Sequence, residues 1–271
     1  MAEFTHASVH KQRRHQLSRS SYRAMVPAPF WTIYGDPSTY KFGSNPDIST
    51  ATVPEDIWTE GGVAFFPTEA LPVTIASASG NDVYPSGTGV REITVSGLDE
   101  SWKYVTAYVR MEGASVVTTD TLFIRVFRAS VHTVGSLGVP DGKVTIQHGG
   151  TTIAAILAGE TSTEMCTFTV PDDMFGEILS AGASIEGNNS ARIKVELQTR
   201  HNHLDADHLG QTAWITRGIA EIRGSIGGAE KDFKVPPFLE PKTDIRLRVV
   251  EASANNLSIT GSFEVICYNP I

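Results

Sequence analysis

The chain has 271 residues, enough for one large β domain or two smaller ones, each with a buried core. Charged residues make up 19%, below the share of about 25% usual in soluble globular domains, while 24 glycines and 14 prolines punctuate the sequence. That composition favours an all-β chain with many turns. No run approaches the roughly 18 apolar residues of a membrane span, and two prolines, Pro27 and Pro29, break the apolar stretch after the basic start. We therefore expect neither a membrane partner nor a signal peptide.

The net charge of −8 is unevenly distributed along the chain. Residues 1–25 carry five cations against Glu3, a local charge of +4, which leaves −12 for the rest. An acidic body repels bare nucleic acid and suits a protein partner, so we do not expect a nucleic-acid partner. The basic start fits an acidic surface, nucleic acid or its own body, although many terminal charge runs are simply solvated.

Residues 1–60 show no strand or helix period. Five prolines recur in PAPFWTIYGDPSTYKFGSNPDISTATVPED, which argues against a long helix or a central strand. The segment is nevertheless too apolar for a free linker. We therefore predict an extended Pro-rich arm over residues 1–60 that lies against its own body or a neighbouring subunit. Its predicted interface anchors are Arg13, Arg14, Arg19, Arg23, Phe30, Trp31 and Tyr34.

Apolar and polar residues alternate from about residue 63 onward. In RIKVELQ, the residues Ile193, Val195 and Leu197 share one side, and DIRLRVV repeats the pattern. Similar segments are REITVSG, YVTAYVRM, TLFIRVF, KVTIQ, TFTV, AWITRGIAEIRGSI, FKV, LSIT and SFEVI. Many short strands separated by turn residues predict a jelly-roll-like antiparallel β-sandwich over residues 61–271. A sub-boundary near residues 131–139 is an alternative that no linker composition marks.

The two cysteines, Cys166 and Cys267, lie in apolar, strand-like segments. A disulfide framework would need more cysteines at closer spacing. We therefore expect two buried free thiols in a protein that matures in a reducing cytosol.

The segment HNHLDADH, residues 201–208, is the strongest candidate for a metal site. If the preceding strand continues, His201, His203 and Asp205 point to one side, and imidazole with carboxylate suits zinc or manganese. Metal sites usually draw ligands from at least two rigid segments, and no second cluster of such residues occurs in the sequence. We therefore interpret the segment as a polar loop that leaves a strand, and we expect no metal and no cofactor.

Other patterns for catalysis or ligand binding are incomplete. Gly87-Thr88-Gly89 lacks the third glycine and the following helix of a dinucleotide loop, and no P-loop, GxSxG or HExxH motif occurs. Asp172-Asp173 fits a turn better than a pair of catalytic carboxylates. Trp58, Trp102 and Trp214 could line a sugar site, although core packing explains them more simply. We therefore expect a protein without catalytic activity.

Several sequence blocks together resemble structural proteins encoded in the virion gene clusters of tailed bacteriophages. These blocks are GSNPDISTATVPEDIWTEGG, GTGVREITVSGLDESWK, FIRVFRASV, GKVTIQHGGTTIAAILAGETSTEMCTFTVP and PKTDIRLRVVEASANNLSITGSFEVI, within residues 43–266. The resemblance implies a non-enzymatic β-sandwich protein that decorates or cements the capsid in many copies. It transfers no catalytic or ligand residue, and the arm up to about Pro29 does not match.

From the resemblance and the composition we expect a capsid decoration or cement protein that binds the major capsid protein or other virion proteins. We expect a homo-oligomer, with a trimer favoured, on the outer capsid surface of a virion made in the bacterial host cytoplasm. The alternatives are a phage neck, tail or baseplate component, a carbohydrate-binding β-sandwich module, and a metal-dependent enzyme that uses residues 201–208.

Overall fold

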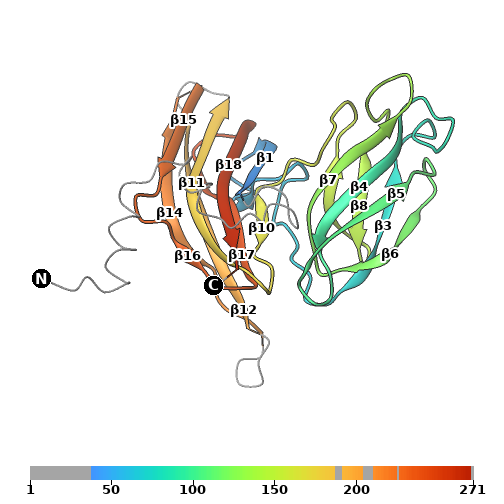
Figure 1. Cartoon of the computed structure of the whole chain (residues 1–271). Coiled ribbons are helices and arrows are strands. Elements are labelled where there is room, and N and C mark those ends of the chain that lie inside the picture. The colour runs from blue at the N-terminus through green and yellow to red at the C-terminus, as the bar shows by residue number, and fades with distance from the viewer. Residues whose placement is uncertain (1–37, 187–190, 204–209, 225, 270–271) are drawn as a thin grey trace, which may run out of the picture.

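The computed structural model describes residues 38–186, 191–203, 210–224 and 226–269 (Figure 1). All strand pairings among these residues are antiparallel, and none of these residues is helical. The strands form two sandwich-like lobes that lie side by side. The prediction of an all-β, jelly-roll-like antiparallel β-sandwich is confirmed. No helix long and apolar enough to cross a membrane occurs in the described part of the chain.

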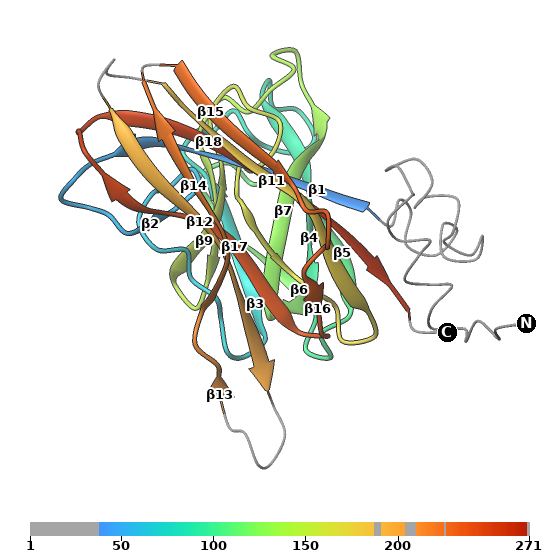
Figure 2. The same ribbon diagram turned by 90° about the vertical axis from the view of Figure 1, so that its left-hand side faces the viewer.

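The larger lobe contains both ends of the described chain. One of its sheets has the order β1-β18-β11-β15, with β16 beside β11, and the other has the order β10-β17-β12-β13, with β14 beside β12 and β2 beside β17. Its strands are β1 (Ser38–Ile48), β2 (Glu55–Asp56), β10 (Thr167–Thr169), β11 (Phe175–Glu186), β12 (Arg192–His203), β13 (Gly210–Gln211), β14 (Ile215–Arg223), β15 (Ile226–Asp232), β16 (Phe238–Leu239), β17 (Thr243–Ala252) and β18 (Leu257–Tyr268). Figure 2 shows these strands face-on.

The second lobe is inserted between β2 and β10, and we call it the inserted lobe. It pairs a four-stranded sheet, β6-β3-β8-β9, with a three-stranded sheet, β5-β4-β7. Its strands are β3 (Leu71–Ser77), β4 (Val90–Leu98), β5 (Tyr104–Arg110), β6 (Val117–Phe123), β7 (Arg125–Val134), β8 (Val144–His148) and β9 (Thr151–Ile156). Each lobe buries its own apolar cluster, so each has the layered architecture that a stable β domain requires.

The lobe boundaries differ from the domain boundaries predicted from the sequence. Residues 38–48 form the edge strand β1 and residues 55–56 form β2, so the predicted arm over residues 1–60 extends too far. Residues 131–139 lie in β7 and the loop after it, inside the inserted lobe, and mark no boundary. The chain instead crosses between lobes twice, within residues 57–70 and within residues 157–166. Residues 1–37 lie outside the described residues.

Strand β17 explains how the sequence alternation relates to the packing. The apolar side of the strand, Ile245, Leu247 and Val249, is buried in the core of the large lobe as predicted. Arg246 on the opposite side is also buried, at 4% exposure. Both faces of this strand are therefore covered, and its arginines need buried partners.

The prediction of two buried free thiols is confirmed, because Cys166 and Cys267 are buried and unpaired. Cys166 donates its thiol proton to the carbonyl oxygen of Gly261 at 3.0 Å. Burial raises the pKa of the Cys166 thiol, and it raises that of Cys267 to about 12. Both groups are therefore protonated thiols at neutral pH, and the protonated form is a poor nucleophile.

We expect neither thiol of the native protein to react with an aqueous disulfide reagent at pH 8. Two thiols per chain are expected to react once the protein is unfolded in denaturant. A colorimetric thiol titration measures both states. Rapid reaction of either cysteine in the native protein would contradict the burial of its side chain.

Candidate functional site at the junction of the two lobes

Strand β7 of the inserted lobe packs against the large lobe. The ring of Phe127 lies 4.6 Å from that of Phe168 on β10, measured between centroids. The ammonium group of Lys41 on β1 donates a hydrogen bond to the carbonyl oxygen of Phe127. The guanidinium of Arg128 lies over the ring of Phe42 at 4.6 Å. The apolar core of the large lobe therefore continues into the inserted lobe.

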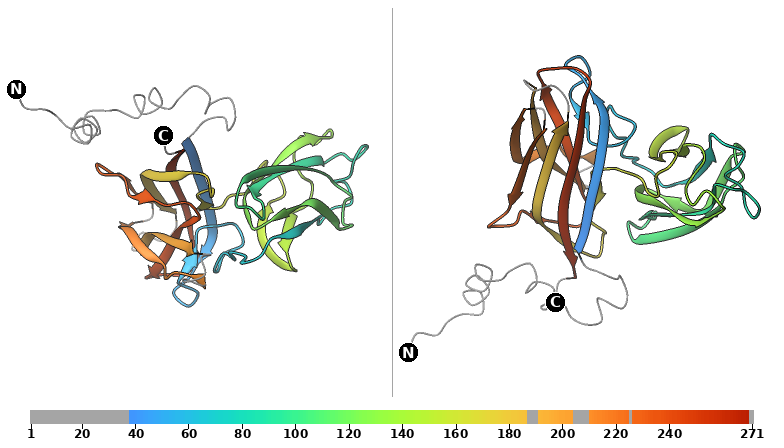
Figure 3. Two further views of the ribbon diagram at one scale, coloured as in Figure 1. Left: turned by 60° about the horizontal axis from the view of Figure 1, so that its bottom comes forward. Right: turned by 90° about the horizontal axis from the view of Figure 1, so that it is seen from above.

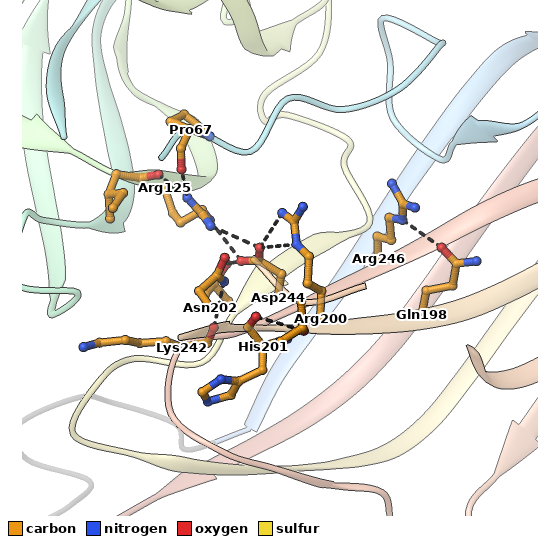
Figure 4. A network of polar contacts seen from close by, with 12 residues as sticks. Pro67, Arg125, Gln198, Arg200, His201, Asn202, Lys242, Asp244 and Arg246 are labelled. Carbon is orange, nitrogen blue, oxygen red and sulfur yellow. Dashed lines mark hydrogen bonds and ion pairs between the residues drawn. The ribbon is translucent and has the colours of Figure 1, made fainter. Parts of the chain in front are cut away.

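A buried carboxylate, Asp244 on β17, is the centre of this junction (Figure 4). Arg125 on β7 binds both of its oxygens, with Nε to Oδ1 at 3.0 Å and Nη2 to Oδ2 at 3.1 Å. Arg200 on β12 approaches Oδ2 with Nη2 at 2.7 Å, and Thr169 donates to Oδ1 at 2.7 Å. Arg125 also donates to the carbonyl oxygen of Pro67 in the linker between the lobes. One carboxylate thus connects both lobes and the linker.

Aromatic rings separate and cover the arginines of the junction. Arg125 lies over Trp102 at 4.8 Å and over Phe66 at 5.5 Å. Arg200 lies over Phe66 at 5.2 Å and over Trp214 at 4.4 Å, and Trp214 also stacks on Arg246 at 3.8 Å. Cation–π contacts with rings of this kind contribute about 0.5–2 kcal/mol each, more when water is excluded. The rings therefore replace part of the hydration that the buried guanidinium groups lose.

A second buried carboxylate, Asp56 on β2, contacts two further arginines of β17. Its Oδ2 lies 3.4 Å from Nη1 of Arg246, and its Oδ1 lies 3.1 Å from Nε of Arg248. The backbone amide of Ala64, in the linker, donates to Oδ2 at 2.9 Å. Arg246 also donates from Nε to the side-chain oxygen of Gln198 at 3.0 Å, as Figure 4 shows.

The two carboxyl groups have pKa values shifted in opposite directions. Burial raises the pKa of Asp56, and Arg246 and Arg248 oppose that increase only in part. Burial also acts to raise the pKa of Asp244, but Arg125 and Arg200 outweigh it, so the pKa lies below its usual value. A lowered folded-state pKa means that Asp244 contributes stability at neutral pH, which is lost as the pH falls through that pKa. The junction therefore depends on an ionised Asp244.

This geometry holds the two lobes in a fixed relation. Asp56 and Asp244 are both fully buried, at 0% exposure, so neither carboxylate is open to a substrate. Shifted pKa values mark catalytic sites only in part, since structural ion-pair networks produce them too. The arrangement thus fits a structural role between the lobes.

The sequence candidates fall mostly outside this junction. Every predicted arm anchor lies within residues 1–37, outside the described residues, so those predictions stay predictions. These anchors are Arg13, Arg14, Arg19, Arg23, Phe30, Trp31 and Tyr34.

The interpretation of residues 201–208 as a polar loop that leaves a strand is wrong for residues 201–203, while residues 204–208 lie outside the described residues. Strand β12 continues to His203, because β13 pairs with it through Asn202↔Gln211 and His203↔Gly210. Nε2 of His201 lies 3.4 Å from an oxygen of Glu240. Asp205 lies outside the described residues, and no three His, Cys, Asp or Glu residues within them gather as metal ligands. Metal binding by His201, His203 and Asp205 is therefore untested.

We expect purified protein to retain less than a stoichiometric amount of zinc or manganese after dialysis against a weak chelator. Elemental analysis of the wild type beside the double variant His201→Ala/His203→Ala measures this. Stoichiometric metal in the wild type, absent from the variant, would contradict the expectation.

The tryptophans predicted to be core residues are largely buried. Trp58 is 5% exposed and Trp102 4%, and Trp214 is half-buried beneath two arginines. Trp102 also adopts a left-handed backbone with φ of 59°, which is strained for a bulky residue and places its ring under Arg125. Trp102 and Trp214 are part of the junction, Trp58 packs in the apolar cluster of the inserted lobe, and none of the three lines an open sugar site.

Sequence reasoning missed the central residues of the junction. Arg125, Arg200 and Asp244 lie in strands whose polar positions are typical of a solvent-facing side. The one available signal is the arginine within the apolar segment TLFIRVF, where a charge interrupts residues that would otherwise form a core. Its partner 119 residues away could not be identified from one sequence.

No protein-family model matches the chain, and a search of curated proteins finds no match. Among solved structures, the chain has low similarity to the infectious bursal disease virus Gx strain, with 10% identity over 86% of this chain and 71% of that one, at a TM-score of 0.25. It is also similar to the VP2 subviral particle of infectious bursal disease virus, with 10% identity, 86% and 72% coverage and a TM-score of 0.15. Derived T=1 particles of that virus align with 8% identity, 86% and 74% coverage and a TM-score of 0.16. TM-scores this low give no basis for inferring function.

Proposed function

We propose that this chain is a non-enzymatic structural protein of a virus particle. More specifically, we propose a capsid decoration or cement protein of a tailed bacteriophage, which binds the major capsid protein on the outer surface of the shell. The observation that carries the proposal is the junction around Asp244, which fixes two β lobes as one body. The resemblance of residues 43–266 to phage virion proteins supports the same role.

In the proposed mechanism, the two-lobed β body and the N-terminal segment have separate roles. A cement protein must resist distortion, and ion pairs shielded from water keep the lobes at a constant angle better than a flexible linker would. The basic N-terminal segment adds contact area without a further folded domain. Many copies on a symmetric shell favour a homo-oligomer, and a trimer matches a local three-fold axis.

Co-sedimentation with capsids tests this proposal directly. Full-length protein is expected to sediment, at a saturable ratio, with capsids assembled from the major capsid protein of the same virus. A variant that lacks residues 1–37 is expected to bind at least tenfold more weakly. The deletion ends before Ser38, so it leaves β1 intact. If neither protein binds capsids but one binds necks, tails or baseplates, the position in the virion is different and the cement role is excluded.

A second candidate function, carbohydrate binding, rests on three exposed tyrosines of the inserted lobe. Tyr104 and Tyr108 on β5 are 49% and 69% exposed, and the ring of Tyr108 lies 5.0 Å from that of His132. Arg110 lies 4.4 Å over the ring of Tyr84. Aromatic side chains with nearby polar groups are a common lining of ligand sites. A glycan array that detects binding by the wild type, lost in Tyr108→Ala, would favour this role.

A further inference from the structure

The large lobe carries an open groove of about 540 Å³ on the face of its β1-β18-β11-β15 sheet that is turned away from the core. These four strands lie side by side in the right-hand view of Figure 3. The groove is lined by Tyr40, Phe42, Gly43, Ser44, Glu164, Gly182, Ala183, Ser184, Gly228, Ala229, Glu230, Thr260, Gly261 and Ser262.

Small residues in register form the floor of this groove. Ser44 pairs with Thr260, Thr260 with Ser184, and Ser184 with Gly228, so one row of small side chains crosses all four strands. The hydroxyls of Ser184 and Thr260 lie 2.7 Å apart. Small side chains leave the sheet backbone close to the surface, so an extended polypeptide can lie against it.

Carboxylates lie in and beside the groove, while Arg128 stacks on Phe42 at its β1 edge. Glu164 and Glu230 line it directly. Glu186 and Glu264 follow groove residues by two positions along their strands, so they point to the same face. At the β1 edge the lining becomes aromatic, where Tyr40 is 59% exposed. A complementary occupant would combine positive charge with aromatic side chains.

We propose that this groove binds the N-terminal segment of its own chain, residues 1–37. The segment carries the +4 of residues 1–25, and its aromatic residues Phe30, Trp31 and Tyr34 stand next in sequence to β1. Gly35-Asp36-Pro37 are turn-forming residue types directly before Ser38, two residues from Tyr40 at the aromatic end of the groove. The inference concerns the chain alone and does not depend on the proposed virion role.

The length of the segment suits this arrangement. Thirty-seven residues reach about 120 Å when extended, while three strand spacings amount to roughly 15 Å. The segment can therefore reverse direction before β1 and cross the whole sheet. Attraction between exposed opposite charges weakens as salt shortens the Debye length from about 10 Å at 0.1 M to about 3 Å at 1 M. Occupancy of the groove should thus fall with ionic strength.

Limited trypsin digestion of the full-length protein tests the proposal, because trypsin cuts after Lys11, Arg13, Arg14, Arg19 and Arg23. At low salt these sites are expected to be cut slowly. Glu230→Lys, which reverses a groove charge, is expected to raise the cleavage rate at least tenfold. Asp120→Lys changes the net charge equally at an exposed position on β6 of the inserted lobe and should leave the rate unchanged.

Gly228→Leu blocks the groove by the size of the new side chain, without changing its charge. A β-carbon at this position meets only Ser184 at 3.5 Å and Ala183 at 3.6 Å, so the substitution fits the strand. It is expected to accelerate cleavage as Glu230→Lys does, while circular dichroism confirms the fold of each variant. Equal cleavage rates in the wild type and both groove variants would overturn the proposal.

Carbodiimide cross-linking identifies which copy supplies the segment. The reagent joins an amine to a carboxylate in direct contact, and Lys11 and the terminal amine are the candidates in residues 1–37. Mass spectrometry of a mixture of isotope-labelled and unlabelled protein is expected to find links to Glu230 or Glu164 within one copy. Links that join labelled to unlabelled chains, or links only to carboxylates outside the groove, would contradict docking in the same copy.

Discussion

Asp244→Asn is expected to lower the free energy of unfolding by about 3–5 kcal/mol, the usual cost of leaving one partner of a buried ion pair alone. The variant keeps the size of the side chain and removes its charge. Arg125 and Arg200, both in contact with Asp244, then lose the negative charge that they share in the native protein. Arg125 belongs to the inserted lobe and Asp244 to the large lobe. The substitution therefore weakens the contact between the two lobes.

Calorimetry and chemical denaturation measure this effect. The wild type is expected to unfold in one transition, while Asp244→Asn should show two, as the lobes separate before each unfolds. Glu251→Gln is the matched control, since Glu251 pairs with Lys194 and Arg192 at a half-exposed site on the same strand. Exposed pairs contribute less than about 1 kcal/mol, so the control should resemble the wild type. An equal effect of the two substitutions would contradict the role assigned to the junction.

The buried Lys41 is expected to make the protein more stable at pH 9 than at pH 7, by on the order of 2 kcal/mol from this group alone. Burial, with the nearby positive charge of Arg128, lowers the pKa of Lys41 from 10.5 to about 7. Between these two values the unfolded chain binds more protons than the folded one. The free energy of unfolding therefore rises with pH through this window.

Lys41→Met removes the buried ammonium group and should remove this dependence on pH. At pH 7 we expect a net gain in stability of about 1–3 kcal/mol, because the desolvation cost exceeds the hydrogen bond lost at the carbonyl of Phe127. Lys143→Met is the control, since Lys143 lies at a partly exposed site beside Glu60, 2.8 Å away. Urea denaturation from pH 7 to pH 9 measures all three proteins. An unchanged slope in Lys41→Met would show that another group is responsible.

Strand β1 shows where prediction from the sequence failed. Its inward-facing residues are Lys41, Gly43 and Asn45, while its aromatic residues Tyr40 and Phe42 face the groove. The alternation is therefore reversed from that of a half-buried strand, and the segment resembled an unpaired arm. Lys41 is satisfied by the carbonyl oxygen of Phe127 in the inserted lobe, and Asn45 by Glu55 on β2. The local sequence of β1 gives no signal for either partner.

The strands of the large lobe were predictable where one face meets an apolar core and the other meets water. Strand β12 fits that rule, since Ile193, Val195 and Leu197 are buried as predicted. The rule fails at Arg125 of the inserted lobe, which pairs with Asp244 of the large lobe, and at Arg246, which Trp214 covers. Long-range contacts of this kind depend on topology, so alternation along one strand cannot reveal them.

A three-dimensional reconstruction of the intact particle whose genome encodes this chain tests the central claim most directly. The account predicts density for both lobes, in the relative orientation of Figure 1, at repeated positions on the outer surface of the capsid shell. Absence of the chain from purified particles would contradict the structural role. Density in which the two lobes take different relative orientations from copy to copy would contradict the junction as the feature that joins them.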